Sequence, residues 1–453
     1  MPPLPAAAAE PLSAHPPVSI LPVTETLTPL SLPAPADAEE WLDARARDDL
    51  ERARELVAGI KADKPTDAVD LLNRWNDVSI AIGNVASVSS LFSEVHPLEA
   101  VRSRGEAAMQ EVQKLDTELS LDRDLYEVFA AVDGPATAAL DPVAKRLFDK
   151  TLLDFHRGGV DKDDATRARV KELSERAILV GQEFSKNIRD DVRSVRVTPD
   201  KLAGMPQDWV DAHPVEEDGL VTLTTDYPDV VPFSTYGRDR DTRRALRMEF
   251  LNRAWPANDA LLTELFELRR EHAQLLGYPD WAEYDAEVKM IKHGSAIPEF
   301  IDRIADAALA SGERDRQVVL DRMRQDFPDA ETIDASDLAY YAEAVRREQL
   351  DVDAQQVRTY FDFTAVRRGL LEVTGRLFGL TYRPAEDAVL WDEAVAAYDV
   401  HLTETDERLG RIYLDLHPRE GKFKHAAQFD LVRGIRGRRG RGAPGGRTRG
   451  TAW

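Results

Sequence analysis

Apolar residues recur every three or four positions along much of the chain, beginning at about Asp37. Residues at this spacing share one face of an α-helix, so each series predicts a helix that packs its apolar face against a core. Pro97 and the turn Asp133–Pro135 separate successive series. The predicted helices comprise the series Leu42 to Ile60, Leu71 to Phe92 and Leu98 to Leu115, two shorter helices within 121–156, and one long charged helix over 161–194.

The apolar period then changes. Ser194–Thr198 and Leu220–Thr224 alternate apolar and polar residues, which is typical of strands, and Leu202–Pro206 reads as a turn between them. Helices resume at about Asp239. The remaining predicted elements are helices over 239–327, broken at Trp255-Pro256, at Gly277–Pro279 and at Gly294, a helical block over 336–378, and short strands near Tyr398–Thr403 and Ile412–Leu416. The pattern predicts a mainly α protein with small β insertions.

The two ends of the chain differ from the rest in composition. Residues 1–36 are rich in Pro and Ala, and we expect a disordered leader. No Lys or Arg precedes Arg45, so the positive region of a signal peptide is missing. From Gly434 the chain reads GIRGRRGRGAPGGRTRGTAW. We interpret residues 434–453 as a frameshifted Gly/Arg-rich tail, a reading that the adjacent downstream DNA tests. An RNA-binding arm is the alternative, weakened by the lack of any aromatic residue before Trp453.

Charge and cysteine content limit the classes of partner. The net charge is −23, and we expect such a surface to repel nucleic acid and anionic lipid and to favour neutral or cationic ligands. There is no Cys, which excludes disulfides, thiol nucleophiles and Cys-ligated zinc and fits a cytoplasmic protein. No continuous run of 18 apolar residues is present, so no membrane-spanning helix is expected. The oligomeric state is left open.

Several segments resemble one family when taken together. The segment LRREHAQLLGY (268–278), the segment WAEY (281–284) and the run RIYLDLHPREGKFKHAAQFDL (411–431) are similar to the thimet oligopeptidase, neurolysin and oligopeptidase A family of zinc metallopeptidases. The resemblance covers roughly 160–433, with weaker similarity upstream. It implies a two-lobed helical fold with a channel for short peptides. It divides the chain into a helical N-terminal and middle region over 37–335, with a small β insertion near 194–234, and a partial catalytic lobe over 336–433.

The resemblance also implies a zinc ion held by an H-E-x-x-H helix and a later Glu, with the motif's Glu as general base. This chain has nine His, and no two of them are four residues apart; His417 and His425 come closest. In the family that motif follows the segment that matches Phe423–Val432. We therefore expect the chain to stop short of the catalytic part, to bind no zinc specifically and to be inactive as written, although full-length relatives use zinc.

Three polar residues admit a functional and a structural reading. His213 could belong to a metal site with Glu216 and Glu217, but a solvated loop is favoured. His272 lies within a predicted helix, where packing is the default role and catalysis the alternative. Asp415 alternates with leucines on a strand, which favours a solvent-facing carboxylate or a structural ion pair over acid–base chemistry.

Arg419, Lys422 and His425 are the candidate substrate-binding residues. The resemblance places their segment near the channel floor, where they could align a peptide backbone or its terminal carboxylate. The alternative is that they only shape the turn after Pro418. No catalytic residue and no metal ligand is assigned to this chain.

Three functional hypotheses follow. The first is a zinc-dependent metalloendopeptidase for short peptides by descent, present without its catalytic segment. The second is a non-catalytic peptide-binding or scaffolding protein. The third is a chain whose helices from about 336 onward have unpaired apolar faces, for example at Leu370, Leu371, Leu377 and Phe378, which favours aggregation.

Overall fold

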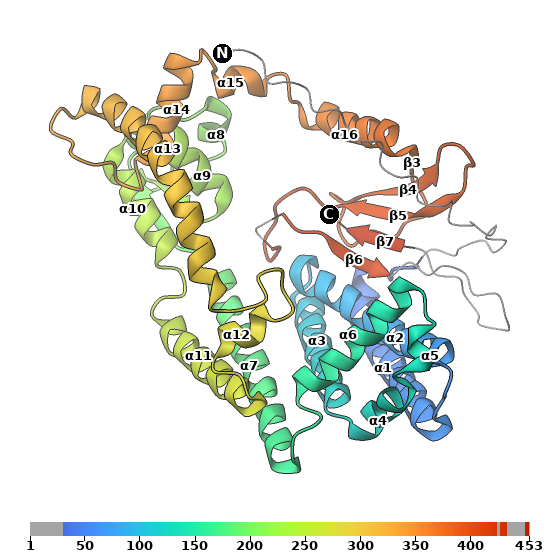
Figure 1. Cartoon of the computed structure of the whole chain (residues 1–453). Helices are drawn as coiled ribbons and strands as arrows, with labels where there is room; N and C mark the ends of the chain where they lie inside the picture. The colour runs from blue at the N-terminus through green and yellow to red at the C-terminus, as the bar shows by residue number, and fades with distance from the viewer. Residues whose placement is uncertain (1–29, 424–425, 433–448, 453) are drawn as a thin grey trace, which may run out of the picture.

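A computed structural model describes residues 30–423, 426–432 and 449–452 of the chain (Figure 1). In this part of the chain helices predominate, so the mainly α class predicted from the sequence is confirmed. The helices are α1 (Ala38–Asp63), α2 (Ala68–Val95), α3 (Glu99–Ser120), α4 (Arg123–Val132), α5 (Pro135–Ala138), α6 (Pro142–Gly158), α7 (Asp164–Asp190), α8 (Gln207–Asp211), α9 (Tyr227–Tyr236), α10 (Arg240–Leu251), α11 (Ala257–Leu276), α12 (Trp281–Ala286), α13 (Ala296–Asp326), α14 (Leu338–Gln349), α15 (Ala354–Arg358) and α16 (Phe363–Phe378).

The strands form two small sheets. The first pairs β1 (Ser194–Val197) antiparallel with β2 (Val221–Thr224). The second has the order β3-β4-β5-β7-β6. Its strands are β3 (Leu380–Pro384), β4 (Ala396–Leu402), β5 (Arg408–Leu414), β6 (Phe429–Val432) and β7 (Arg449–Ala452). All neighbouring pairs in it are antiparallel except β5 and β7, which are parallel.

Aspartate and glycine set many of the helix ends. A carboxylate oxygen that accepts a first-turn N–H satisfies one of the four amide groups left free at a helix N-terminus, and a glycine at positive φ ends a helix without steric cost. Asp67, Asp122, Asp141, Asp163 and Asp239 cap helices in this way. Gly159, Gly277 and Gly379 end α6, α11 and α16 in the left-handed region.

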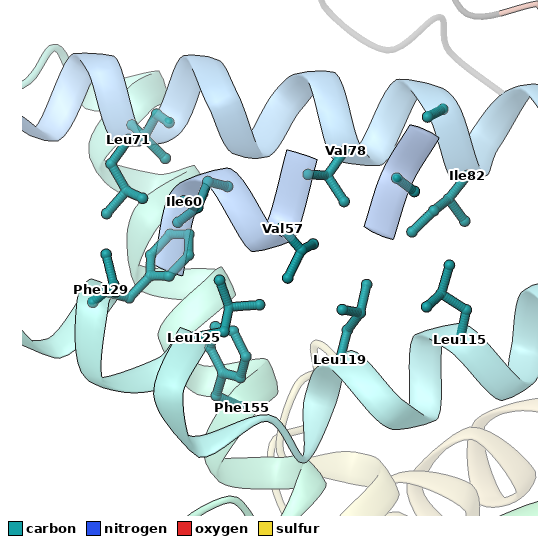
Figure 2. Packing of buried hydrophobic residues seen from close by; sticks show 14 of the residues in the cluster. Val57, Ile60, Leu71, Val78, Ile82, Leu115, Leu119, Leu125, Phe129 and Phe155 are labelled. Atoms are coloured by element: carbon teal, nitrogen blue, oxygen red, sulfur yellow. The ribbon is translucent and has the colours of Figure 1, made fainter. Parts of the chain in front are cut away.

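The main core lies among the N-terminal helices α1 to α4 and α6. Leu71 on α2, Ile60 on α1 and Leu125 on α4 are almost fully buried and point toward one another (Figure 2). Phe129 lies among Trp75, Phe148 and Phe155 with ring centroids 5.6–5.8 Å apart. Burial of these large apolar side chains is the dominant favourable term in the folding of this body.

The five-stranded sheet packs on the same helical body. Trp391, Tyr413 and Leu431 from the sheet region are buried against α2 residues that include Phe92. Leu32 joins this second cluster with 5% of its surface exposed. The boundary predicted at residue 36 for the leader is therefore corrected, because the packed chain begins no later than Leu30. Residues 1–29 lie outside the described residues.

The remaining helices form a second arm that faces the first. The long helix α7 leaves the N-terminal body and packs along α11, while α9, α10, α13 and α14 stand beyond it (Figure 1). Helices α15 and α16 then return the chain from this arm to the sheet (Figure 1). The chain therefore passes twice between the arms, once through α7 and once through α15–α16.

The sequence-based elements largely agree with these bounds. The β1–β2 pair, β4, β5 and the helix breaks near Pro256, Gly277 and Gly294 are as predicted. The sequence pattern did not show α8 and α9, which lie within the predicted β insertion, or strands β3, β6 and β7. Of the predicted Gly/Arg-rich tail, only Arg449–Ala452 lies within the described residues, where it forms β7.

One described helix is long and apolar enough, by length and composition, to cross a membrane. It is α2, with a mean hydropathy of 1.4 over an 18-residue window. This qualifies the expectation that no such helix exists. About 67% of that window is buried inside the protein, however, and a buried core helix meets the same criterion, so this is weak evidence for a membrane span.

Helix α16 buries none of its sixteen residues. Leu370, Leu377 and Phe378 are 52%, 70% and 64% exposed, which confirms the apolar faces expected from the sequence, while Leu371 is half-buried. Exposed apolar side chains at Phe363, Val366, Leu370, Val373 and Leu377 follow the spacing of a coiled-coil seam.

We expect this seam to make the protein self-associate, because large exposed apolar patches favour association. Leu370→Glu should shift the chain toward monomer in sedimentation velocity, as it places a charge in the centre of the seam. Thr364→Glu adds the same charge away from the seam and should leave association unchanged. A wild-type chain that stays monomeric up to the highest soluble concentration would contradict this expectation.

Candidate functional site

A cleft of about 1500 Å³ lies between the two arms. Its walls come from α3, α7 and α9 and from the segment between β5 and β6. This volume exceeds the range of about 300–1,000 Å³ that is usual for small-molecule pockets. Its size therefore suits an extended ligand, such as a segment of polypeptide.

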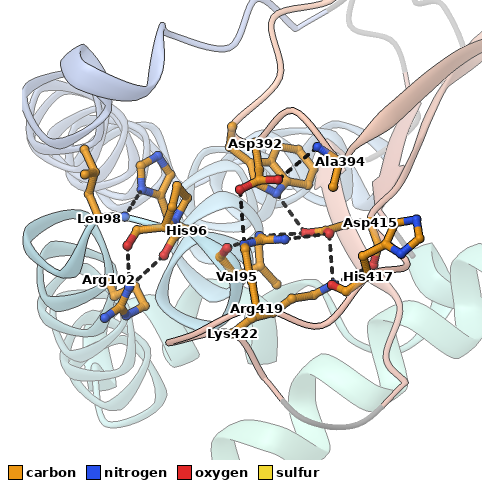
Figure 3. Close-up of polar contacts among 12 residues, drawn as sticks. Val95, His96, Leu98, Arg102, Asp392, Ala394, Asp415, His417, Arg419 and Lys422 are labelled. Atoms are coloured by element: carbon orange, nitrogen blue, oxygen red, sulfur yellow. Dashed lines mark hydrogen bonds and ion pairs between the residues drawn. The ribbon is translucent and has the colours of Figure 1, made fainter. Parts of the chain in front are cut away.

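Asp415 is the centre of a polar network on the cleft wall that the segment forms (Figure 3). Only 6% of the residue is exposed. Arg419 donates to both of its carboxylate oxygens at 2.7 and 2.8 Å, Lys422 Nζ donates at 2.8 Å and Trp391 Nε1 at 2.9 Å. Burial opposes ionisation, but these hydrogen bonds outweigh it and hold the pKa of Asp415 below its usual range. The structural ion pair is confirmed, and the solvent-facing alternative is wrong.

The same segment is fastened to the C-terminal end of α2. Arg419 Nη2 donates to the Val95 carbonyl, and the Phe423 amide donates to the Glu94 carbonyl at 2.7 Å. These contacts satisfy two carbonyl groups that have no partner within the last turn of a helix. The cleft wall formed by 415–423 is therefore held in place by a helix that lies more than 300 residues earlier in the sequence.

Gly421 lies where this segment approaches α3 closely. Its φ is +70°, and a Cβ placed there would lie 2.7 Å from the Arg102 guanidinium carbon. Arg102 in turn donates to the His96 and Pro97 carbonyls, each at 2.9 Å. A side chain at position 421 would adopt a strained backbone conformation, and the flexible end of Arg102 would have to shift to make room for it.

The structure places two of the three candidate substrate-binding residues on the cleft wall. Arg419 and Lys422 line the cleft, yet their side chains are only 15% and 11% exposed and most of their donors bind Asp415 and nearby carbonyls. The alternative, that Arg419 and Lys422 only shape the turn after Pro418, requires contacts of this kind. A direct contact with substrate stays a prediction. His425 lies outside the described residues.

Sequence reasoning missed the opposite walls of the cleft. Arg189 on α7 pairs with Glu106 on α3 at 2.9 Å and so joins two of the cleft-lining helices. Lys186, Glu99 and Glu420 also line the cleft, are exposed, and make no ion pair with any described residue. In the sequence the four residues on α3 and α7 look like ordinary solvated positions on helices, so no local signal could have identified them, whereas Glu420 lies within the run 411–431 that carries the resemblance.

His213 packs inside the region around strands β1 and β2. Its ring stacks on Trp209 with centroids 3.7 Å apart, its Nδ1 lies 2.7 Å from the Trp209 carbonyl oxygen, and its Nε2 lies 2.9 Å from Asp229. Only 15% of the His213 side chain is exposed, so the prediction of a solvated position is wrong for His213, whereas Glu216 and Glu217 are exposed as predicted. The stacking surface is supplied by α8, which the sequence pattern did not show.

His272 has the packing role that was favoured for it. Its ring contacts Trp281 and Tyr284 with centroids 5.7 and 5.5 Å apart. Burial, with a smaller contribution from the charge of Arg157, lowers the pKa of His272 below its usual value. The imidazole is therefore neutral at pH 7 and lies outside the cleft.

His96, at the end of α2, gives this region a pH-dependent stability. It is 1% exposed, its Nδ1 accepts a hydrogen bond from the Leu98 amide, and its Nε2 has no partner among the described residues. Burial, aided by the charges of Arg419 and Arg102, lowers the pKa of His96 to about 4. Because protonation is easier in the unfolded chain, this residue should destabilise the fold as the pH falls from 6.5 toward 4.

We expect His96→Asn to remove that pH dependence. Each pH unit in this window should cost the wild type up to about 1.4 kcal/mol through His96, and the variant should lose this part of the slope. Urea unfolding of both proteins at several pH values measures it. His293→Asn is the matched control, since the His293 side chain is 73% exposed. Parallel wild-type and His96→Asn profiles between pH 6.5 and 4 would contradict the assignment.

The described residues do not fit the zinc ion that the resemblance implies. No group of three or more His, Asp or Glu side chains in residues 30–423, 426–432 and 449–452 is placed to hold a metal ion. Zinc sites of the catalytic type need three protein ligands that converge on one point. No hydrolytic step is therefore derived from this set of residues.

Comparison with known proteins agrees with the resemblance seen in the sequence. Residues 233–447 match peptidase family M3. Saccharolysin of Saccharomyces cerevisiae is 26% identical over 77% of this chain and 52% of its own length. The thimet-like oligopeptidase of Dictyostelium discoideum is 25% identical over 90% of the chain and 63% of its own length.

Oligopeptidase A of Escherichia coli is 26% identical over 79% of the chain. The match covers 54% of that protein, so the chain spans between about half and two-thirds of the length of these relatives. The matched region includes α10 to α16 and the segment 415–423 that forms one wall of the cleft. The match over residues 233–447 and the similarity to these relatives support assignment of the chain to peptidase family M3.

Proposed function

We propose that the cleft between the two arms binds short peptides and that the chain is the peptide-binding part of a zinc-dependent oligopeptidase. The observation that carries this proposal is the cleft itself, about 1500 Å³ in a chain of a peptidase family, walled by the segment 415–423. The names of saccharolysin and of two oligopeptidases among the relatives support the choice of peptide as ligand.

The residues of the chain have separable tasks in this proposal. Asp415, Arg419 and Lys422 hold the segment against α2, so that its backbone lies along the cleft. Lys186, Glu99 and Glu420 are exposed charges that can face a bound peptide. The net charge of −23 favours basic over acidic peptides, chiefly at low ionic strength.

The family resemblance implies zinc-dependent hydrolysis, but the described residues of this chain do not supply the zinc ligands. We propose that this chain alone cleaves no peptide, because the described side chains offer no three-ligand metal site. The second function is therefore non-catalytic peptide binding or scaffolding, which uses the same cleft. Turnover of a short peptide by clean protein, abolished by a chelator, would contradict the proposed inactivity and leave the binding proposal standing.

Fluorescence anisotropy with labelled short peptides tests the binding itself. We expect a basic peptide to bind more tightly than an acidic peptide of the same length, with the difference shrinking as salt is added. Lys186→Glu should strengthen the preference for the basic peptide, because it reverses a charge on the cleft wall. Lys114→Glu makes the same change on α3 at a residue that does not line the cleft and should have a smaller effect. No binding at millimolar peptide would remove the proposal.

A further inference from the structure

A second cavity, of about 320 Å³, lies where α3, α6, α7, α11 and α12 meet. It shares no lining residue with the peptide cleft. Its volume falls at the lower end of the range usual for small-molecule sites. Five helices from distant parts of the sequence build it, so its shape is fixed by the packing of the helical body.

Polar side chains without partners line this cavity. Asp116 on α3, Asp154 on α6 and Ser174 on α7 make no side-chain hydrogen bond or ion pair with any described residue, and both carboxylates are exposed. His272 on α11 also lines the cavity, and its Nε2 is buried without a hydrogen-bond partner among the described residues. A buried polar atom is rarely left without a partner in native proteins, so the His272 Nε2 is unusual for a purely structural junction, whereas the two exposed carboxylates can be solvated by water.

The one guanidinium group on the cavity wall is already neutralised. Arg157 pairs with Glu287, donates to the Tyr284 carbonyl at 2.8 Å, and lies 4.0 Å from the centroid of the Tyr284 ring. Its side chain is 11% exposed. The charges of Asp116 and Asp154 therefore remain uncompensated by a dedicated ion pair.

The energetics of both carboxyl groups agree with this geometry. The surrounding protein partly desolvates the Asp116 carboxyl group, although the residue is exposed at the surface, and this desolvation raises the pKa of Asp116 to about 6. Burial also raises the pKa of Asp154, although the charges of Lys150 and Arg157 act in the opposite direction. A raised carboxyl pKa means that the site disfavours an uncompensated anion, and a cation bound beside it would relieve that cost.

We propose that this cavity binds a small organic cation of the alkylamine or diamine class. Ammonium groups would contact the Asp116 and Asp154 carboxylates, and the methylene chain would lie against Leu121 and Val170, which are buried on the cavity wall. The excess of acidic residues over the whole chain raises the local concentration of such cations. The site is independent of the peptide cleft and of the function proposed for it.

Isothermal titration with putrescine, at low salt and slightly alkaline pH, tests this proposal. We expect one site of millimolar affinity or better, with succinate, a dianion of the same chain length, giving no binding. Asp116→Asn and Asp154→Asn should each weaken binding at least about fivefold, because each removes one charge contact. Asp149→Asn is the matched control, since Asp149 lies on α6, pairs with Lys145 and does not line the cavity.

A second readout locates the bound amine. Putrescine should shift the ring resonances of His272 in the NMR spectrum of the wild type, and it should raise the melting temperature of the wild type but not of the Asp116→Asn, Asp154→Asn double variant. Circular dichroism verifies that the variants are folded. Absence of binding at millimolar putrescine, equal affinities in all variants, or a response confined to residues of the peptide cleft would each overturn the proposal.

Discussion

Asp337→Asn is expected to lower the free energy of unfolding by about 3–5 kcal/mol, because it removes the carboxylate that two arginines share. Arg243 Nη2 donates to Asp337 at 2.7 Å and Arg240 Nε donates to it at 2.8 Å. The side chains of Arg243 and Asp337 are 1% and 0% exposed, so the substitution leaves a buried guanidinium group without a counter-charge. The remaining partners of Arg243 are the Gly237 and Arg238 carbonyls and the ring of Tyr340.

The consequence should reach beyond local stability, because this ion pair joins α10 to the start of α14. Helix α14 also packs on α9, which lines the peptide cleft. Urea unfolding measures the loss, with Asp329→Asn as the matched control, since Asp329 is exposed and has no side-chain partner among the described residues. The double variant Arg243→Met, Asp337→Leu should recover most of the loss, because it removes both buried charges together. A loss below about 1 kcal/mol in the single variant would show that the pair is not coupled as described.

Asp415→Asn should have a comparable effect at the cleft wall. It should lower the free energy of unfolding by about 3–5 kcal/mol if the segment 415–423 unfolds together with the body. The change leaves Arg419 and Lys422, which are largely buried, without their shared carboxylate. Because the pKa of Asp415 is lowered in the folded protein, the contribution of Asp415 to stability is fully present at pH values above 3.8, its pKa in the unfolded chain. This contribution is lost as the pH falls through the lower pKa of the folded protein. The segment should then detach from α2 and peptide affinity should fall with it.

Hydrogen exchange and peptide binding together measure this prediction. Faster exchange of the Phe423 amide, which donates to Glu94, should accompany the loss of affinity. Asp430→Asn is the matched control, as Asp430 lies on β6, the next strand along the chain, is exposed and has no side-chain partner among the described residues. Unchanged stability with lost peptide binding would contradict the structural role and favour direct contact of this cluster with substrate.

Arg419→Ala separates the same two roles from the other side of the pair. The contacts of Arg419 with Asp415 and with the Val95 carbonyl predict that the substitution lowers stability, and that any loss of peptide affinity follows from this loss of stability. A substrate-aligning role, which the sequence suggested, predicts lost peptide affinity at unchanged stability. The structure thus turns a prediction about function into a choice between two measurable outcomes.

The sequence predicted most helices because their ends carry local signals. Asp239 caps the start of α10 and Gly277 ends α11, each through contacts with nearby backbone groups. The apolar series breaks near both residues, which marks these helix ends in the sequence. Helix α9 was missed because Pro232 lies within it and its apolar residues follow no clear period. Strand β3 was missed because it directly follows α16 at Gly379, where the apolar series shows no interruption.

Only one wall of the cleft could be predicted from the sequence. The segment around Arg419 was found because it resembles a family motif, and the structure places it on the cleft wall. The facing residues Arg189 and Glu106 come from α7 and α3, and no short-range pattern connects them to position 419. The same holds for Asp337 and Arg243, which are 94 residues apart in the sequence. Such sites arise from tertiary packing, which a single sequence read locally does not show.

Photo-crosslinking of a short peptide that carries a benzoylphenylalanine tests the central claim most directly. After irradiation and digestion, mass spectrometry identifies the crosslinked residues. Peptide binding in the cleft predicts adducts on the cleft-lining residues of α3, α7 and α9 and on the segment 415–423, with excess unlabelled peptide suppressing them. Adducts confined to the exposed seam of α16, or labelling that excess unlabelled peptide does not suppress, would contradict the claim.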